Sequence, residues 1–99
     1  MKKGGCVYII TNQYNKILFT GSTTLLRARI WEHKSKAFPN SFSAKYNCNK
    51  LVWYEVFPTI MEAIEKEKQI KASNRKNKKL LIEKLNPEWK DLFDFVQDL

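Results

Sequence analysis

The chain has 99 residues, the usual size of one compact domain, and we expect residues 1–99 to form a single domain. Hydrophobic residues make up 43% and aromatic residues 13%, which suffices for one core and excludes a disordered tail. The apolar runs are far shorter than the roughly 20 residues that span a bilayer, and residues 1–3 open no signal segment. We therefore expect a cytoplasmic protein without membrane partners.

The charge balance is strongly basic. Eighteen Lys and Arg residues stand against ten Asp and Glu residues, which gives a net charge of +8. Four of the ten acids lie in residues 88–99, so the preceding part is more positive still. Such a surface attracts polyanions, and nucleic acid is the commonest one that a small cytosolic protein meets. A basic surface that serves solubility alone is the alternative.

Cysteine and histidine are too few for a structural zinc site. Cys6 and Cys48 stand far apart, and the chain has a single histidine, His33. This excludes the four ligands of a zinc finger and argues against a disulfide framework. We expect both cysteines to be buried or spectator thiols.

The first part of the chain has the pattern of a β-hairpin followed by a helix. Residues 6–11 and 16–20 are rich in β-branched and aromatic side chains and are separated by a short turn-forming segment. Residues 21–24 are expected to break the second strand and to offer hydroxyl caps to a helix at about 24–36. Residues 37–49 follow as a loop with one helical turn near Phe42.

The second part of the chain is predicted to contain one strand and two helices, at residues 51–57, 60–72 and 75–85. Pro58 ends the strand, and Thr59 and Glu62 form a capping box in front of the first of these helices. The second helix stops before Pro87. The tail is expected to pack on the sheet through one apolar stripe of Trp89, Leu92, Phe93 and Val96.

One acidic residue, Glu67, falls on the apolar face of the predicted helix 60–72. Helical spacing places four apolar residues on that face, namely Ile60, Ala63, Ile64 and Ile70. Burying an ionised carboxylate alone is costly, so Glu67 should have a cation partner, a metal ion or a raised pKa. An internal ion pair, or a position at the edge of the face that reaches solvent, is the structural alternative.

Three other side chains suited to chemistry accompany Glu67. Arg29 and His33 project from one face of the predicted helix 24–36, one turn apart. Arginine can neutralise a phosphate through two parallel hydrogen bonds, and histidine can move a proton near neutral pH. Tyr8 faces away from its strand neighbours, which suits a core or a catalytic role equally. An Arg–Glu ion pair beside a half-buried histidine remains the structural interpretation.

Five landmarks in order along the chain carry a family resemblance. They lie at residues 6–8 (Cys-Val-Tyr), 18–21 (Leu-Phe-Thr-Gly), 21–33, 63–71 and 86–92. At these residues the chain resembles the GIY-YIG nuclease superfamily, in particular its small single-domain bacterial members. The resemblance covers about residues 6–93, and five spaced landmarks in order are far more specific than any one alone.

The resemblance implies an α+β fold with a small three-stranded antiparallel sheet flanked by helices. It also implies hydrolysis of phosphodiester bonds in nucleic acid, DNA before RNA, with low sequence specificity. No obligate protein partner is evident in the sequence. Tyr8, Arg29, His33 and Glu67 would be catalytic, and Glu67 would bind one divalent cation, Mg²⁺ or Mn²⁺. A group of basic residues, called here the basic segment, would contact phosphates: Lys66, Lys68, Lys71, Arg75, Lys76, Lys78 and Lys79.

Two positions depart from the family pattern. Cys6 replaces a glycine that merely begins a strand, whereas Phe19 replaces a tyrosine whose phenol is often assigned to activating water. Phenylalanine cannot exchange a proton, so the general base would be Tyr8, His33 or water activated by the cation.

Two rival functions follow from these positions. In the first, the protein is a nucleic-acid-binding module that kept the scaffold and lost the chemistry through Phe19. In the second, the basic surface meets a protein partner, and Glu67 and Arg29 pair with each other.

Overall fold

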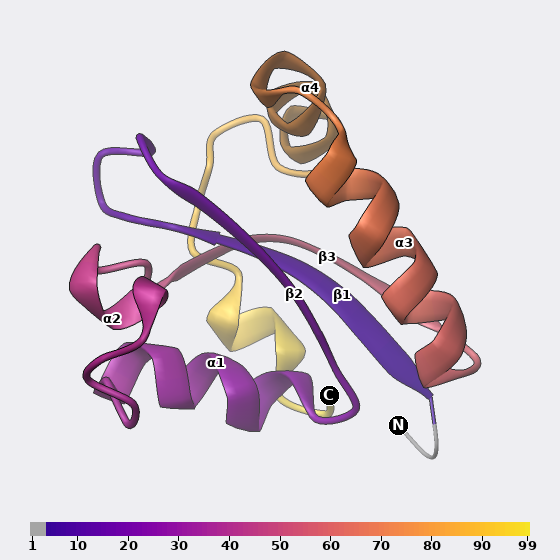
Figure 1. The fold of residues 1–99 in the computed structure, drawn as a ribbon, viewed down its shortest axis with the longest axis horizontal. Helices are drawn as coiled ribbons and strands as arrows, with labels where there is room; N and C mark the ends of the chain where they lie inside the picture. The colour runs from indigo at the N-terminus through magenta and orange to yellow at the C-terminus, as the bar shows by residue number, and fades with distance from the viewer. Residues whose placement is uncertain (1–3) are drawn as a thin grey trace.

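A computed structural model describes residues 4–99 of the chain (Figure 1). The strands β1 (Gly5–Thr11), β2 (Leu18–Thr23) and β3 (Lys50–Phe57) form an antiparallel sheet in the order β2-β1-β3. The α+β class and the three-stranded sheet that the resemblance implies are confirmed. The prediction that residues 1–3 open no signal segment concerns residues outside the described range.

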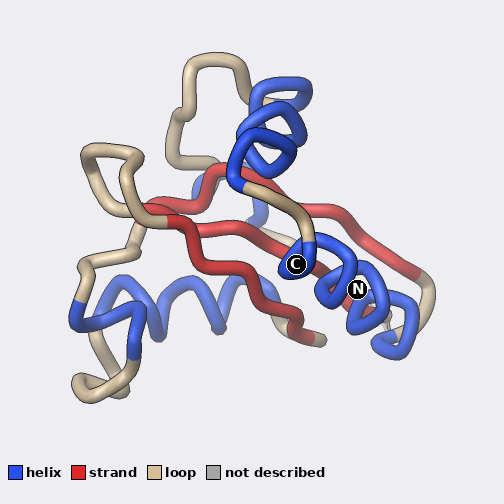
Figure 2. Tube along the Cα trace, turned by 45° about the horizontal axis from the view of Figure 1, so that its top comes forward, coloured by secondary structure: helices blue, strands red, loops and turns tan. Residues whose placement is uncertain are grey.

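Helices cover both faces of this sheet (Figure 2). They are α1 (Leu26–Ser35), α2 (Phe42–Lys45), α3 (Ile60–Ala72), α4 (Arg75–Leu85) and the 3-10 helix η1 (Phe93–Val96). The helices α1 and η1 pack on one face, and α3 and α4 pack on the other. Within residues 4–99 no helix combines the length and apolar character needed to cross a membrane.

The central strand β1 is buried along its whole length and divides the core in two. Its residues Cys6, Tyr8 and Ile10 pack with α1, whereas Val7 and Ile9 pack with α3 and α4. This alternation follows from the two-residue period of a strand. Burial raises the pKa of the Cys6 thiol and likewise that of Cys48, which is also buried in the α1-side core.

The strand β2 begins two residues later than predicted and ends three residues later, so it continues through Gly21 to Thr23. Residues 21–23 pair with β1 in register, and these ladder bonds outweigh the breaking tendency of the local sequence. No hydroxyl caps the first turn of α1 as predicted, because the Thr23 hydroxyl accepts a 3.0 Å bond from the N–H of the cap residue Leu25 and not from the helix itself. Instead, the backbone carbonyl of Leu99 accepts a 2.9 Å hydrogen bond from the Leu26 N–H.

The tail does not form the single apolar stripe that the spacing predicts. Trp89 packs in the α3 and α4 core, whereas Leu92, Phe93 and Val96 pack in the α1 core. A single stripe requires helical spacing, but the backbone at Trp89 is left-handed, with a φ of 56°, and the 3-10 helix begins only at Phe93. The tail therefore connects the two cores.

The connection runs along the outer edge of β3. Leu92 N–H donates to the Leu51 carbonyl at 2.7 Å, and Leu51 N–H donates to Asp91 Oδ1 at 3.2 Å. The buried Asn86 amide donates to the Val52 carbonyl at 3.1 Å. These bonds satisfy backbone groups that an edge strand would otherwise expose.

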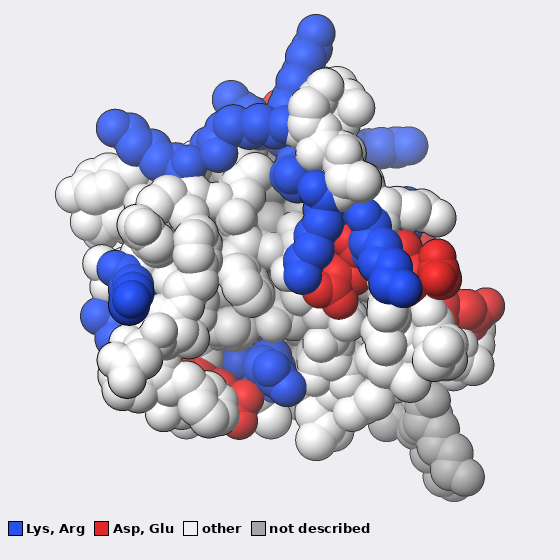
Figure 3. Space-filling model, viewed as in Figure 1, with Lys and Arg blue, Asp and Glu red and all other residues white. Residues whose placement is uncertain are grey.

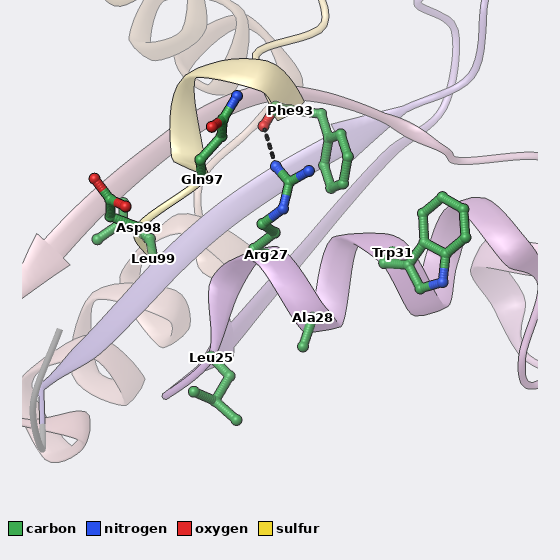
Figure 4. Close-up of a pocket in the computed structure, with 8 residues that line it drawn as sticks. All are labelled: Leu25, Arg27, Ala28, Trp31, Phe93, Gln97, Asp98 and Leu99. Atoms are coloured by element: carbon green, nitrogen blue, oxygen red, sulfur yellow. Dashed lines mark hydrogen bonds between the residues drawn. The ribbon is translucent and has the colours of Figure 1, made fainter.

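The end of the tail also holds α1 in place (Figure 4). Arg27 donates to the Phe93 carbonyl at 3.2 Å, and its guanidinium carbon lies 4.2 Å from the centre of the Phe93 ring. A hollow of about 540 Å³ lies between this contact, Trp31 and the last residues of the chain. The contact anchors the helix that carries Arg29 and His33.

The remaining predicted elements agree closely with the structure. The helical turn near Phe42 is α2, and the two later helices match α3 and α4. Thr59 Oγ1 accepts a 3.2 Å bond from Glu62 N–H, as the capping box predicts. A helix capped in this way begins at a defined residue, which sets the direction of every side chain along α3.

We predict that Gly5→Ala destabilises the protein by about 1–3 kcal/mol, because the new methyl group overpacks the contact between β1 and α3. A Cβ at Gly5 would lie 2.7 Å from the backbone Cα of Ile60, which cannot rotate away. Urea unfolding measures the change. An unchanged free energy of unfolding would show that α3 shifts freely on the sheet.

Candidate active site

Tyr8 lies directly opposite Gly21 in the pairing of β1 and β2. A Cβ built on Gly21 would lie 2.5 Å from the Tyr8 hydroxyl oxygen and 2.6 Å from the ring carbon that bears it. The tyrosine ring therefore occupies the space that a side chain at position 21 would fill. The glycine of the second motif is needed for this close approach, and it directs the phenol across β2 toward α1.

A chain of hydrogen bonds leads from this phenol into α2. The Tyr8 hydroxyl lies 2.9 Å from His33 Nε2, and His33 Nδ1 lies 2.7 Å from Ser43 Oγ. Ser43 belongs to α2 and is 3% exposed. Both ring nitrogens of the histidine thus have a defined partner, so the imidazole is held in one orientation.

Burial favours the neutral form of both ring groups. Burial raises the pKa of the Tyr8 phenol, the Arg29 guanidinium lowers it, and the carboxylates of Glu67 and Glu32 raise it further. Burial also lowers the pKa of His33 below 6.5, with Arg29 adding to the effect and Glu32 opposing it. A protonated phenol can then donate to Nε2 of a neutral His33 whose Nδ1–H donates to Ser43.

Glu67 extends from α3 toward β2 on the other side of the sheet. Its side chain is 16% exposed, accepts a hydrogen bond from Ser22 Oγ and lies 2.6 Å from Lys71 Nζ. The helical spacing and the structure agree that this carboxylate faces the body of the protein. Ser22 adjoins Gly21 in β2, so neighbouring residues of one strand contact Glu67 and Tyr8.

Arg29 is exposed and does not pair with Glu67. Its Nε lies 3.2 Å from Glu32 Oε1, one helical turn away, and its side chain is 47% exposed. The interpretation in which Arg29 and Glu67 pair is therefore not the arrangement found, since Glu67 pairs with Lys71. Both charges nevertheless influence the pKa of the Tyr8 phenol, which Arg29 lowers and Glu67 raises.

Basic side chains lie on the surface around the candidate active site (Figure 3). They gather over α3 and α4, and a separate group lies over α1, with uncharged surface between them. In the basic segment, Lys66 and Lys78 are half-buried and the other members are exposed. Arg75 donates to the Asn15 carbonyl at 3.0 Å and Lys78 to the Ser73 carbonyl at 2.9 Å, so these two also support the fold.

Sequence reasoning missed two serines and the local role of one lysine. Lys71, which the resemblance assigns to phosphate contacts, pairs with Glu67. Their spacing of four residues along a helix is the sequence signal for this pair. Ser22 and Ser43 lie in segments assigned to a turn and a loop. No periodic pattern marks such residues, because their partners lie in distant elements.

The carboxylate oxygens of Glu67 are ligands of the type that a hard divalent cation prefers. Within residues 4–99 no group of three His, Cys, Asp or Glu side chains could hold a metal ion. A cation at Glu67 would therefore keep most of its ligands as water and phosphate oxygens, which is the usual habit of Mg²⁺. The Ser22 hydroxyl is the nearest additional oxygen.

The chain belongs to the GIY-YIG family, since the family model described as the GIY-YIG catalytic domain matches residues 4–80. Members of this family act on nucleic acid and generally depend on a divalent metal.

Two relatives place the chain more closely. It is 34% identical over 82 residues to a UPF0213 protein of Syntrophus aciditrophicus (strain SB), an alignment that covers 83% of this chain and 92% of that protein. Its fold is similar to the solution NMR structure of a UPF0213 protein from Bacillus halodurans, with a TM-score of 0.57 and 24% identity. That match covers 94% of this chain and 97% of the other.

We predict that His33 makes stability fall as the pH is lowered through 6.5. Its folded pKa lies below 6.5, so in the interval between the two values the unfolded chain binds a proton that the folded chain does not. Denaturant unfolding above and below pH 6.5 should show a smaller decrease for His33→Gln than for the wild type. Equal decreases in the two proteins would contradict the lowered pKa.

Proposed function

We propose that the protein is a divalent-metal-dependent endonuclease that hydrolyses phosphodiester bonds in nucleic acid, DNA in preference to RNA, with low sequence specificity. The observation that carries the proposal is the hydrogen bond between the Tyr8 hydroxyl and His33 Nε2, formed where Arg29 and Glu67 both influence the phenol. It supplies a path for a proton beside groups that can hold a phosphate and a cation.

In the proposed reaction, Tyr8 and His33 move the proton of the attacking water. Tyr8 accepts this proton while its own hydroxyl proton passes to His33 Nε2, so the phenol ends unchanged and the imidazole becomes charged. The raised pKa of Tyr8 suits such a coupled transfer, because the buried phenol is not ionised in advance. Ser43 keeps the histidine oriented during the transfer.

Arg29 and Glu67 act on the phosphate from two sides. Arg29 is exposed and held only by a surface ion pair with Glu32, so it can turn to the negative charge that develops on the phosphate. Glu67 would hold the cation, which when bound polarises the phosphate and stabilises the leaving oxygen. Lys71 is exposed enough to move from Glu67 to a phosphate oxygen.

The basic segment would then position the nucleic acid without reading its sequence. Contacts from lysine and arginine to phosphates set the register of a bound strand and carry no base information. We therefore propose low specificity and no obligate protein partner. We also propose that the protein is cytoplasmic.

A second candidate function is supported by Phe19. Its ring lies 6.5 Å from the Tyr8 ring and 5.5 Å from the His33 ring, in the position of the second motif tyrosine, but it has no hydroxyl. If both phenols are required, the protein binds nucleic acid at this site and cleaves it slowly or not at all.

We predict that Glu67→Gln lowers the rate of Mg²⁺-dependent plasmid nicking by about 100-fold or more. The amide oxygen can still accept the bond from Ser22, so folding should be preserved, while the charge that holds the cation is lost. Glu65→Gln is the matched control, since Glu65 lies on the same helix with its side chain 69% exposed. Equal rates for the two variants would remove the metal role of Glu67.

We predict that Phe19→Tyr raises the nicking rate by about tenfold or more, because it restores a second proton-exchanging group beside Tyr8 and His33. Gel assays at fixed metal concentration measure the change, with Phe95→Tyr as the control for an added phenol on the surface. A folded Phe19→Tyr protein that cuts no faster would show that this phenol is dispensable here.

A further inference from the structure

A small hollow with aromatic walls lies beside the proposed proton path, between α1 and α2. Its volume is about 180 Å³, and its lining includes Phe19, Phe38 and Phe42 together with the side chains of Arg29 and Lys36. We call these five residues the aromatic pocket. His33 and Ser43 also border it, so its inner end reaches the imidazole that contacts Tyr8.

The rings continue from this inner end to the surface. The Tyr8 and Phe19 ring centres are 6.5 Å apart, and Phe19 and Phe42 are stacked with centres 6.1 Å apart. The ring centres of Phe42 and Tyr46 are in turn 4.7 Å apart. The inner ring of this row is buried, with Tyr8 2% exposed, whereas the outer rings Phe42 and Tyr46 are 49% and 47% exposed.

Core packing alone does not account for the outer members of the row. Phe38 is 62% exposed, and both Phe42 and Tyr46 keep nearly half of their surface in contact with water. A group of exposed rings in one place typically marks a binding surface. On a nuclease, the flat apolar ligand that such rings accept is a nucleobase, which stacks on them regardless of sequence.

The charges around the pocket suit a nucleotide. Arg29 and Lys36 line it, and Lys45 is exposed on α2. Glu32, the acidic residue of the lining, is paired with Arg29. A base between the rings would carry its flanking phosphates past these cations, and Arg29 would connect the base-binding pocket to the phosphate being cleaved.

We propose that the aromatic pocket binds one unpaired nucleobase next to the scissile phosphate, a specificity that rests on the proposed nuclease function. The hollow is smaller than the roughly 300–1,000 Å³ of typical ligand sites and suits one planar ring system. A base within a paired stack cannot enter it without leaving the helix. The preferred substrate is therefore a single strand, or a duplex with an unpaired nucleotide at the cleavage point.

The competing explanation is that Phe42 merely holds α2, and hence Ser43, in place. Two substitutions separate these roles, because Phe42→Leu keeps apolar volume without an aromatic face and Phe42→Tyr keeps the face. Phe95→Leu is the control, since Phe95 lies in η1 and is 73% exposed. Thermal unfolding of each variant reports any loss of structure.

Binding is measured in the Glu67→Gln background, in which cutting should be at least about 100-fold slower. The probes are a DNA duplex that carries 2-aminopurine at a single unpaired position and its fully paired counterpart. The unpaired probe should bind more tightly and its fluorescence should be quenched. Phe42→Leu should weaken binding of this probe about tenfold and abolish the quenching. Phe42→Tyr and Phe95→Leu should change neither, and binding of the paired probe should change less than twofold in every variant.

An equal loss of affinity for both probes in Phe42→Leu, or no loss for either, would overturn the proposal. Failure of the pocket proposal and failure of the nuclease proposal give different results. If no nucleic acid is cut with Mg²⁺ or Mn²⁺ but quenching still depends on Phe42, the pocket stands and the nuclease function falls. If cutting occurs with no dependence on Phe42, the reverse holds.

Discussion

The close approach of Tyr8 to Gly21 is the constraint on which the candidate site depends. The register of β1 and β2 sets these residues opposite each other, and the missing side chain lets the phenol cross β2 to His33. The next residue of the same strand, Ser22, turns to the other face and contacts Glu67. One pair of adjacent residues thus brings together a proton path on one side of the sheet and a carboxylate on the other.

The fold was largely predictable where local pattern and long-range pairing agree. The strand 51–57 and the helices 60–72 and 75–85 were placed to within one residue, since caps and proline mark their ends in the chain itself. The end of β2 was not, because its last three residues are strand through pairing with β1. The path of the tail depends on bonds to the edge of β3, which no local pattern records.

The candidate site divides in the same way. Helical periodicity identified the inward direction of Glu67, and strand alternation separated Tyr8 from its neighbours. The partners Ser22 and Ser43 come from segments without periodicity, so their contacts follow only from the tertiary arrangement. The aromatic pocket is not predictable from the sequence for the same reason, since Phe19 and Phe42 are distant in the chain and their stacking follows only from the fold.

The tail that runs along the edge of β3 also affects how the protein unfolds locally. Asn86 donates to both the Val52 and Lys90 carbonyls, and Trp89 and Leu92 insert into opposite cores. Neither layer of helices can detach without disturbing this segment, so amide protons in α1 and α4 should exchange with solvent through one shared opening event. We then expect the two halves of the site to be lost and regained together in one cooperative unfolding event.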